Sequence, residues 1–107
     1  MNPSSRPASF AYIWEFQVAP EHAGRFEQAY GPDGDWAQLF RRHEGYLWTN
    51  LLRDHAHAGR YLTVDYWRTQ ADRDDFLRRF HPEFKVLDAR CGAMTLAETH
   101  LGDFTLP

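Results

Sequence analysis

The segment RYLTVDYW, residues 60–67, has the pattern of a β-strand in which neither face is suited to water. Side chains alternate across a strand with a period of two, so successive residues point to opposite faces of a sheet. The two faces hold different side chains: Tyr61, Thr63, Asp65 and Trp67 on one, and Leu62, Val64 and Tyr66 on the other. Both sets are largely aromatic or aliphatic, and we therefore expect both faces of this strand to be covered.

The segments around this strand predict a small α+β fold. Period-two alternation and the aromatic residues that strands favour predict further strands at 10–18, 45–54 and 93–101. Apolar residues three and four apart predict helical segments at 20–30, 35–43, 69–80 and 82–91. The loop HAHAG is short enough to join its flanking strands as a hairpin. The order βαββαβ is the ferredoxin-like arrangement, in which right-handed crossovers place all helices on one face of a four-stranded antiparallel sheet.

Local signals predict where the helices begin and end. Thr69 and Asp72 resemble a capping box, with Asp in place of the usual Glu. Asp33 or Asp35 is placed to cap the second helical segment. Gly92 stands where a left-handed residue commonly ends a helix.

The helices of this arrangement cover only one face of the sheet. The other face keeps aromatic and aliphatic side chains without cover, and a bare patch of that size is unusual on a soluble monomer. A second copy, packed sheet on sheet about a two-fold axis, would bury both inner faces. We therefore expect a homodimer joined through the open faces of the two sheets.

Length and charge limit the classes of protein to consider. The 107 residues suit one compact domain and are too few for two independent cores. We expect this domain at residues 10–107, after a flexible tail at 1–9 that is rich in proline and serine. Fifteen acidic and twelve basic residues give a formal net charge of -3, which leaves no excess positive charge for a phosphate backbone. Nucleic acid is therefore not an expected partner.

Cysteine content and hydropathy bear on the compartment. The single cysteine, Cys91, excludes an internal disulfide and a metal site built from cysteines, which fits a reducing compartment. No apolar run has the length of a signal peptide or of a membrane span, which needs roughly 20 residues. We therefore expect a cytoplasmic protein with no membrane partner.

Four stretches together resemble a known family. They are AYIWEFQV, AYGPDGDWAQLFRRHEGYLWTNLLRD, RYLTVDYWRTQADRDDF and ETHLGDF, within residues 10–104. In element order and in the GYL and Asp-x-Trp patterns they are similar to the antibiotic biosynthesis monooxygenase domain, one of the dimeric α+β barrel families. The resemblance implies a homodimer with a pocket between sheet and helices in each subunit. Some members oxygenate polycyclic phenols without metal or flavin, some degrade haem, and many have no assigned activity.

The haem-degrading branch of the family can be compared residue by residue. It uses an Asn on the first strand, a Trp on the helix after the third strand, and an axial His on the following helix. The matching positions here hold Glu15, Phe76 and Asp88, so all three depart from the pattern. Without a histidine at the third position there is no evident axial ligand for haem iron, and we do not expect haem as a cofactor.

Asp65 is the first candidate for a functional residue. An acid within an aromatic strand must be paired, hydrogen-bonded or shifted in pKa to tolerate burial. One interpretation is a structural ion pair with Arg53, Arg60 or Arg68. The other is a catalytic proton acceptor that orients a phenolic substrate. We expect substrate contacts from aromatic and polar side chains that could line a pocket for a flat ligand: Trp14, Trp48, Asn50, Trp67 and Phe76.

The histidines give two further candidates and no metal site. His81, at the break between two helices, and His100, on the last predicted strand, are candidate proton shuttles because histidine titrates near neutral pH. Capping of a helix end explains His81 equally well. The local cluster of His55 and His57 beside Asp54 lies in a predicted hairpin loop and lacks a third protein ligand. We therefore expect no metal.

Two functional hypotheses follow. The first is a cofactor-independent monooxygenase-like enzyme acting on a small aromatic or polyphenolic compound, with Asp65 and His81 as catalytic residues; it rests mainly on the resemblance. The second is a non-catalytic dimeric module that binds a small ligand or only assembles, since one fold hosts many functions. A pocket of ligand size containing Asp65 or a histidine favours the enzyme, whereas a pocket filled by Trp and Phe side chains favours the module.

Overall fold

The four strands form one antiparallel sheet in the computed structural model, which describes residues 8–107. The strands are β1 (Phe10–Val18), β2 (Tyr46–Arg53), β3 (Arg60–Trp67) and β4 (Thr95–Thr105). Their order across the sheet is β2-β3-β1-β4, so the first and third strands of the chain are central and the second and fourth form the edges. The predicted tail at 1–9 lies mostly outside the described residues.

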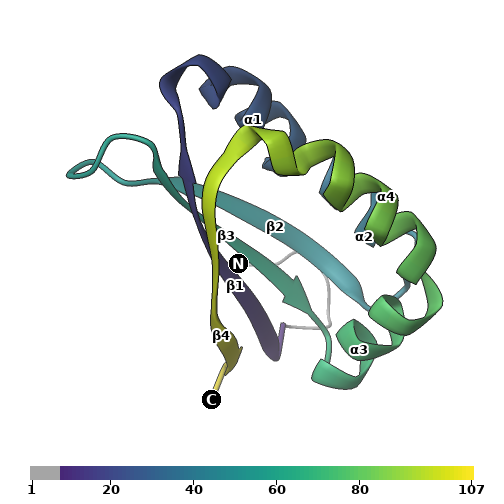
Figure 1. Ribbon diagram of the computed structural model, residues 1–107. Helices are drawn as coiled ribbons and strands as arrows, with labels where there is room; N and C mark the ends of the chain where they lie inside the picture. The colour runs from purple at the N-terminus through teal and green to yellow at the C-terminus, as the bar shows by residue number, and fades with distance from the viewer. Residues whose placement is uncertain (1–7) are drawn as a thin grey trace.

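The helices lie together on one face of the sheet, as Figure 1 shows. They are α1 (Ala23–Tyr30), α2 (Asp35–Phe40), α3 (Gln70–Arg79) and α4 (His81–Cys91), with single 3-10 turns at η1 (Pro20–His22) and η2 (Gly92–Met94). The element order is therefore βαββαβ, and the predicted ferredoxin-like α+β fold is confirmed. No helix among residues 8–107 has the length and hydropathy to cross a membrane.

The core lies between the sheet and the helices and is mainly aromatic. Phe26 of α1 and Phe76 of α3 are fully buried, and Trp67 at the end of β3 is 1% exposed. The ring centroids of Phe76 and Trp67 are 5.4 Å apart, and those of Phe40 and Phe76 are 5.2 Å apart. Such contacts add roughly 0.5–1.5 kcal/mol per pair to the burial of the ring surfaces. The aromatic richness of the sequence therefore forms a layer beneath the helices.

The helix ends follow some of the predicted signals. Thr69 is the N-cap of α3, and its hydroxyl accepts a hydrogen bond of 3.0 Å from the backbone N–H of Asp72, as predicted. The predicted Asp cap of α2 is wrong, because Gly34 occupies the N-cap and no side chain bonds there. Gly92 is also not left-handed, since its φ of -57° keeps it helical and carries the chain into η2.

The hairpin between β2 and β3 contains the irregularity that matters most for the site. Tyr46 pairs with Trp67, but Trp48 pairs with Tyr66, so the register shifts between Tyr46 and Trp48. A shift of this kind inserts one extra residue into one strand and reverses the face to which later side chains point. Thr49 consequently lies directly opposite Asp65 on the face beneath the helices.

Candidate functional site

A cavity of about 440 Å³ lies between the sheet and the helices. Its walls are mostly aromatic, and its polar lining comes from β3, α4 and β4. The residues that line it are Tyr12, Trp14, Phe16, Tyr30, Trp36, Phe40, Thr63, Asp65, Leu77, His81, Phe84, Lys85, Asp88 and Glu98. The volume lies within the range of small-molecule sites, and a mainly apolar lining with few polar groups is typical of them.

Asp65 is the buried acid of this cavity and is 5% exposed. Thr49 Oγ1 donates a hydrogen bond of 2.6 Å to Asp65 Oδ1. The Tyr46 hydroxyl lies 2.7 Å from the same Thr49 oxygen. Among residues 8–107 the bond from Thr49 is the only hydrogen bond of the Asp65 carboxyl group, and Oδ2 takes no part in it. One carboxylate oxygen is therefore held by β2, while the other remains free to contact a ligand.

Burial changes the protonation of this acid. Removal from water raises the pKa of Asp65 to about 7, and the hydrogen bond from Thr49 opposes part of that rise. Near neutral pH the carboxyl group is therefore present in both protonation states. An acid with a pKa close to the working pH is suited to accept and return protons.

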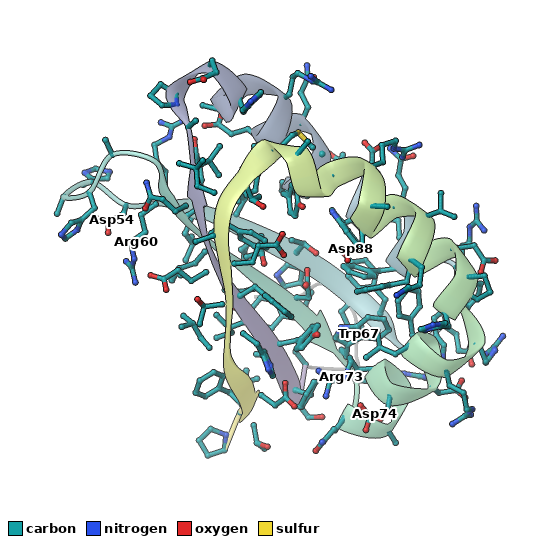
Figure 2. The ribbon with its side chains drawn as sticks, in the orientation of Figure 1. Asp54, Arg60, Trp67, Arg73, Asp74 and Asp88 are labelled. Atoms are coloured by element: carbon teal, nitrogen blue, oxygen red, sulfur yellow. The ribbon has the colours of Figure 1, made fainter. Side chains whose placement is uncertain are left out.

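The structural interpretation of Asp65 as the partner of an arginine is wrong. The three arginines proposed for that role contact other acids: Arg53 with Glu27, Arg60 with Glu15 and Asp54, and Arg68 with Asp72. Figure 2 shows Arg60 beside Asp54 at the hairpin end of the sheet. The arginine side chains project from the strand ends and not into the buried centre of β3. Among residues 8–107 the side chain of Asp65 therefore has one hydroxyl donor, Thr49, and no arginine partner.

Helix α4 provides the polar side of the cavity. His81, Lys85 and Asp88 line it from this helix, at spacings of four and three that place side chains on one face. Asp88 lies on the side of α4 that faces the sheet (Figure 2). Glu98 adds a second acid from β4. These residues are exposed, in contrast to the buried Asp65.

The structure brings together some of the residues predicted for the site. Trp14 lines the cavity with Asp65 and His81. Trp67 and Phe76 are not among the lining residues, because they lie in the packed core between β3 and α3, as Figure 2 shows for Trp67.

Trp48 and Asn50 lie on the opposite face of the sheet from the cavity. Trp48 stacks on Tyr66 of the open face with ring centroids 4.6 Å apart, and its indole N–H donates to Asn50 Oδ1 at 3.4 Å. The structure therefore does not place these two predicted substrate-contact residues at this cavity. The cause is the register shift after Tyr46, which reverses the alternation assumed for β2.

The same shift explains why sequence reasoning missed Thr49. Regular alternation from Tyr46 would place Thr49 on the face away from the acid. A threonine opposite a buried acid in a hairpin predicts a hydrogen bond between the two, but only once the pairing register of the strands is known. Other lining residues, including Trp36 and Phe84, lie in the predicted helical segments, and their contact with a cavity is a result of how the helices sit on the sheet.

An ion-pair network around the buried Arg73 supports the cavity wall beside Tyr12. The guanidinium of Arg73 lies 4.3 Å from the centre of the Tyr12 ring and bonds the carboxylate of Asp103. Asp103 also contacts His100 Nε2 at 3.0 Å, and the His100 ring stacks on Trp14 at 5.3 Å. Figure 2 shows Arg73 and its other partner, Asp74, on α3. The network therefore contacts two aromatic residues that line the cavity, Tyr12 through Arg73 and Trp14 through His100.

The fold and the cavity define a class of protein: a ferredoxin-like α+β domain whose helices enclose an aromatic cavity with one buried acid. Within that class the chain belongs to the antibiotic biosynthesis monooxygenase family, whose model matches residues 9–87. No curated protein matches the chain significantly.

Several solved structures share the fold. SnoaB, a cofactor-independent oxygenase from Streptomyces nogalater, is 20% identical, with 94% of this chain and 95% of that chain covered and a TM-score of 0.69. A candidate antibiotic biosynthesis monooxygenase from Bordetella bronchiseptica is also 20% identical, with 94% and 99% covered and a TM-score of 0.72. A similarly described protein from Deinococcus radiodurans is 17% identical, with 92% and 90% covered and a TM-score of 0.66. At these identities the likeness shows the fold.

Proposed function

We propose that this protein is a cofactor-independent monooxygenase that acts on a small phenolic aromatic compound bound in the cavity. The observation that carries the proposal is a buried acid with one free oxygen, Asp65, in an aromatic-walled cavity of ligand size. The family assignment and the fold shared with SnoaB, a cofactor-independent oxygenase, support the same reaction class.

In this proposal the substrate is flat and largely apolar. Aromatic walls favour a ring system by stacking and edge contacts. Trp14 and Phe16 come from the sheet side, and Trp36 and Phe84 from the helix side, so that a planar ligand has aromatic partners on both sides. Asp65 receives the phenolic hydroxyl at the sheet side of the cavity.

The chemistry requires only the substrate and dioxygen as reactants. Asp65 Oδ2 accepts the phenolic proton, which leaves an electron-rich phenolate. A ring carbon of that anion gives electrons to O₂ and forms a carbon–oxygen bond, and the resulting peroxide takes up a proton. Cleavage of the O–O bond with loss of the ring hydrogen gives a quinone and water, so one oxygen atom enters the product and the other leaves as water.

The protein contributes shape, exclusion of water and proton transfer. An acid whose pKa burial has raised to about 7 can take a phenolic proton and return it within one cycle. His81 lines the same cavity from the start of α4 and is the proposed group for protonating the peroxide. Its exposure allows the proton to be replaced from solvent.

Oxygen uptake tests the proposal directly. The purified protein is mixed with a panel of polycyclic phenols in buffer containing a metal chelator, and O₂ consumption is followed with an electrode. We expect uptake with at least one phenol, and a decrease of roughly two to four orders of magnitude in Asp65→Asn. Arg41→Ala, which alters an exposed ion pair and does not itself line the cavity, is the matched control and should retain wild-type uptake. Ligand binding without oxygen uptake across the panel would instead identify a non-catalytic binding module.

We also propose that two copies assemble through the open faces of their sheets. Leu62, Val64 and Tyr66 of β3 alternate with the residues beneath the helices and therefore belong to the open face; Val64 is buried and the other two are half-buried. The described helices all lie on the opposite face (Figure 1). Trp48 continues this apolar strip on β2. A second copy presents the same strip, so the two faces are self-complementary about a two-fold axis.

A further inference from the structure

Two hydroxyl groups behind Asp65 form a directed chain of hydrogen bonds. An ionised carboxylate can only accept, so Thr49 uses its single proton toward Asp65 Oδ1 at 2.6 Å. The Tyr46 hydroxyl, 2.7 Å from the Thr49 oxygen, must then be the donor of that second bond. All three residues are buried, with 8%, 4% and 5% of their surfaces exposed for Tyr46, Thr49 and Asp65. In this interior each bond polarises the next and strengthens it.

The chain leaves the two oxygens of Asp65 in different situations. Oδ1 is held by Thr49 and faces β2, which prevents free rotation of the carboxyl group. Oδ2 takes no part in that bond, and the residue lines the cavity. When Asp65 is neutral and carries its proton on Oδ2, both hydrogen bonds, from Tyr46 to Thr49 and from Thr49 to Asp65 Oδ1, are kept. The acid therefore offers a ligand one oxygen, which donates when protonated and accepts when ionised.

Other ionisable groups also line the cavity, but none of them bonds the Asp65 carboxyl group among residues 8–107. The titratable lining of the cavity is completed by Tyr12 from β1, Tyr30 from the end of α1, Glu98 from β4, and His81, Lys85 and Asp88 from α4. Helices α2 and α3 contribute apolar groups. The pKa of Asp65 is set by burial, which raises it, and by the Thr49 hydrogen bond, which lowers it.

We propose that Thr49, held by Tyr46, is a positioning residue that sets both the orientation and the protonation of Asp65. A role for Thr49 in catalysis rests on the proposed function. Its effect on the orientation and protonation of Asp65 does not. The bond from Thr49 also narrows the ligand class: Asp65 engages one hydroxyl or carbonyl oxygen of the ligand through Oδ2, while Oδ1 is held by Thr49. A phenol with a single hydroxyl at the inserted end fits this geometry.

The test is the titration of Asp65 itself, followed by ¹³C NMR of its side-chain carboxyl group. Thr49→Val keeps the shape of the side chain and removes the donor, and we expect the Asp65 midpoint to move upward by about one pH unit. Thr49→Ser keeps the hydroxyl and should restore the wild-type midpoint. Tyr46→Phe should move the midpoint in the same direction by a smaller amount, and it tests the chain independently if the valine variant folds poorly.

The outcomes separate this inference from the proposed function. If Thr49 has only a structural role, the valine variant loses thermal stability but Asp65 titrates at its wild-type midpoint, which overturns the inference. If the protein consumes no oxygen with any phenol, the titration still tests the positioning role. If the protein does consume oxygen with a phenol, the midpoint of the pH–rate profile should follow the Asp65 midpoint in Thr49→Val, Thr49→Ser and Tyr46→Phe. A rate profile that stays fixed while the carboxyl midpoint moves would also overturn the catalytic part.

Discussion

The Arg73 guanidinium on α3 binds the Asp103 carboxylate on β4 through two hydrogen bonds, of 3.0 and 2.9 Å, and the arginine is 6% exposed. The pair joins a helix to an edge strand 30 residues away in the sequence. Arg73 also contacts the face of Tyr12, which lines the cavity. Arg73 therefore connects the end of β4 to the wall of the candidate site, through Asp103 on one side and Tyr12 on the other.

Removal of one partner should be costly because the other is left buried. In Asp103→Ala the guanidinium keeps only Asp74 as an acid partner, and we expect a loss of roughly 2–3 kcal/mol in the free energy of unfolding. Urea denaturation measures this as a shift in midpoint at constant slope. Asp33→Ala, which breaks the exposed pair with Arg41, is the control and should cost less than about 1 kcal/mol. Equal losses in both variants would contradict a special role for the ion pair of the buried arginine.

Stability should fall as pH rises through the titration range of Asp65. Its pKa is about 7 in the folded chain and lies near 3.8 in an unfolded one, so between these values the folded state holds more protons. The contribution of Asp65 to stability is therefore full below pH 4 and is lost by about pH 7, up to roughly 4 kcal/mol in total. Asp65→Asn should remove this slope and be more stable than the wild type at pH 8.

The comparison is made by urea unfolding of both proteins at several values from pH 4.5 to 8. All other ionisable groups are the same in both proteins, so their contributions cancel in the difference. The acids whose pKa is lowered by partners, such as Asp75 beside His43 and Asp103 beside Arg73, lose their contribution at lower pH. Parallel curves for wild type and variant would mean that Asp65 is not the titrating group.

Light scattering at micromolar concentration tests the proposed dimer. We expect a particle of about twice the 12.6 kDa chain mass. Trp48→Lys places a charge in the open face of the sheet and should give monomers or unfolded protein, because an unpaired charge in a dry interface is costly. Val86→Lys, on the exposed surface of α4, should leave the mass unchanged. A monodisperse 12.6 kDa wild-type particle would refute the sheet-to-sheet dimer.

Haem binding should be absent or weak. The position used by the axial histidine in the haem-degrading branch is Asp88, which lines the cavity from α4. We expect titration with haemin to give no sharp Soret band that saturates at one haem per chain. A saturating band that disappears in His81→Ala would show that iron is ligated by another residue of the same cavity.

Local patterns in the sequence were enough to predict the architecture. Alternation over FAYIWEFQV and RYLTVDYW matches β1 and β3, and the βαββαβ order was predicted correctly because each element has its own periodicity. The Thr69 cap was predictable for the same reason, since it depends on residues three apart in the chain. Asp65 and His81 were selected by their chemical type and position, and the structure places both at the cavity.

Only the tertiary structure decided which face of the sheet the helices cover and which residues lie beside Asp65. Both faces of β3 are similarly apolar, so alternation separates two sets of side chains but does not say which set the helices cover. The face of Trp48 and the pairing of Thr49 with Asp65 depend on the register shift after Tyr46, which is fixed by hydrogen bonds between strands. The cavity depends on how α2 and α4 rest on the sheet, because its lining comes from segments far apart in the chain. Such contacts are set by packing across the whole fold, and no local pattern encodes them.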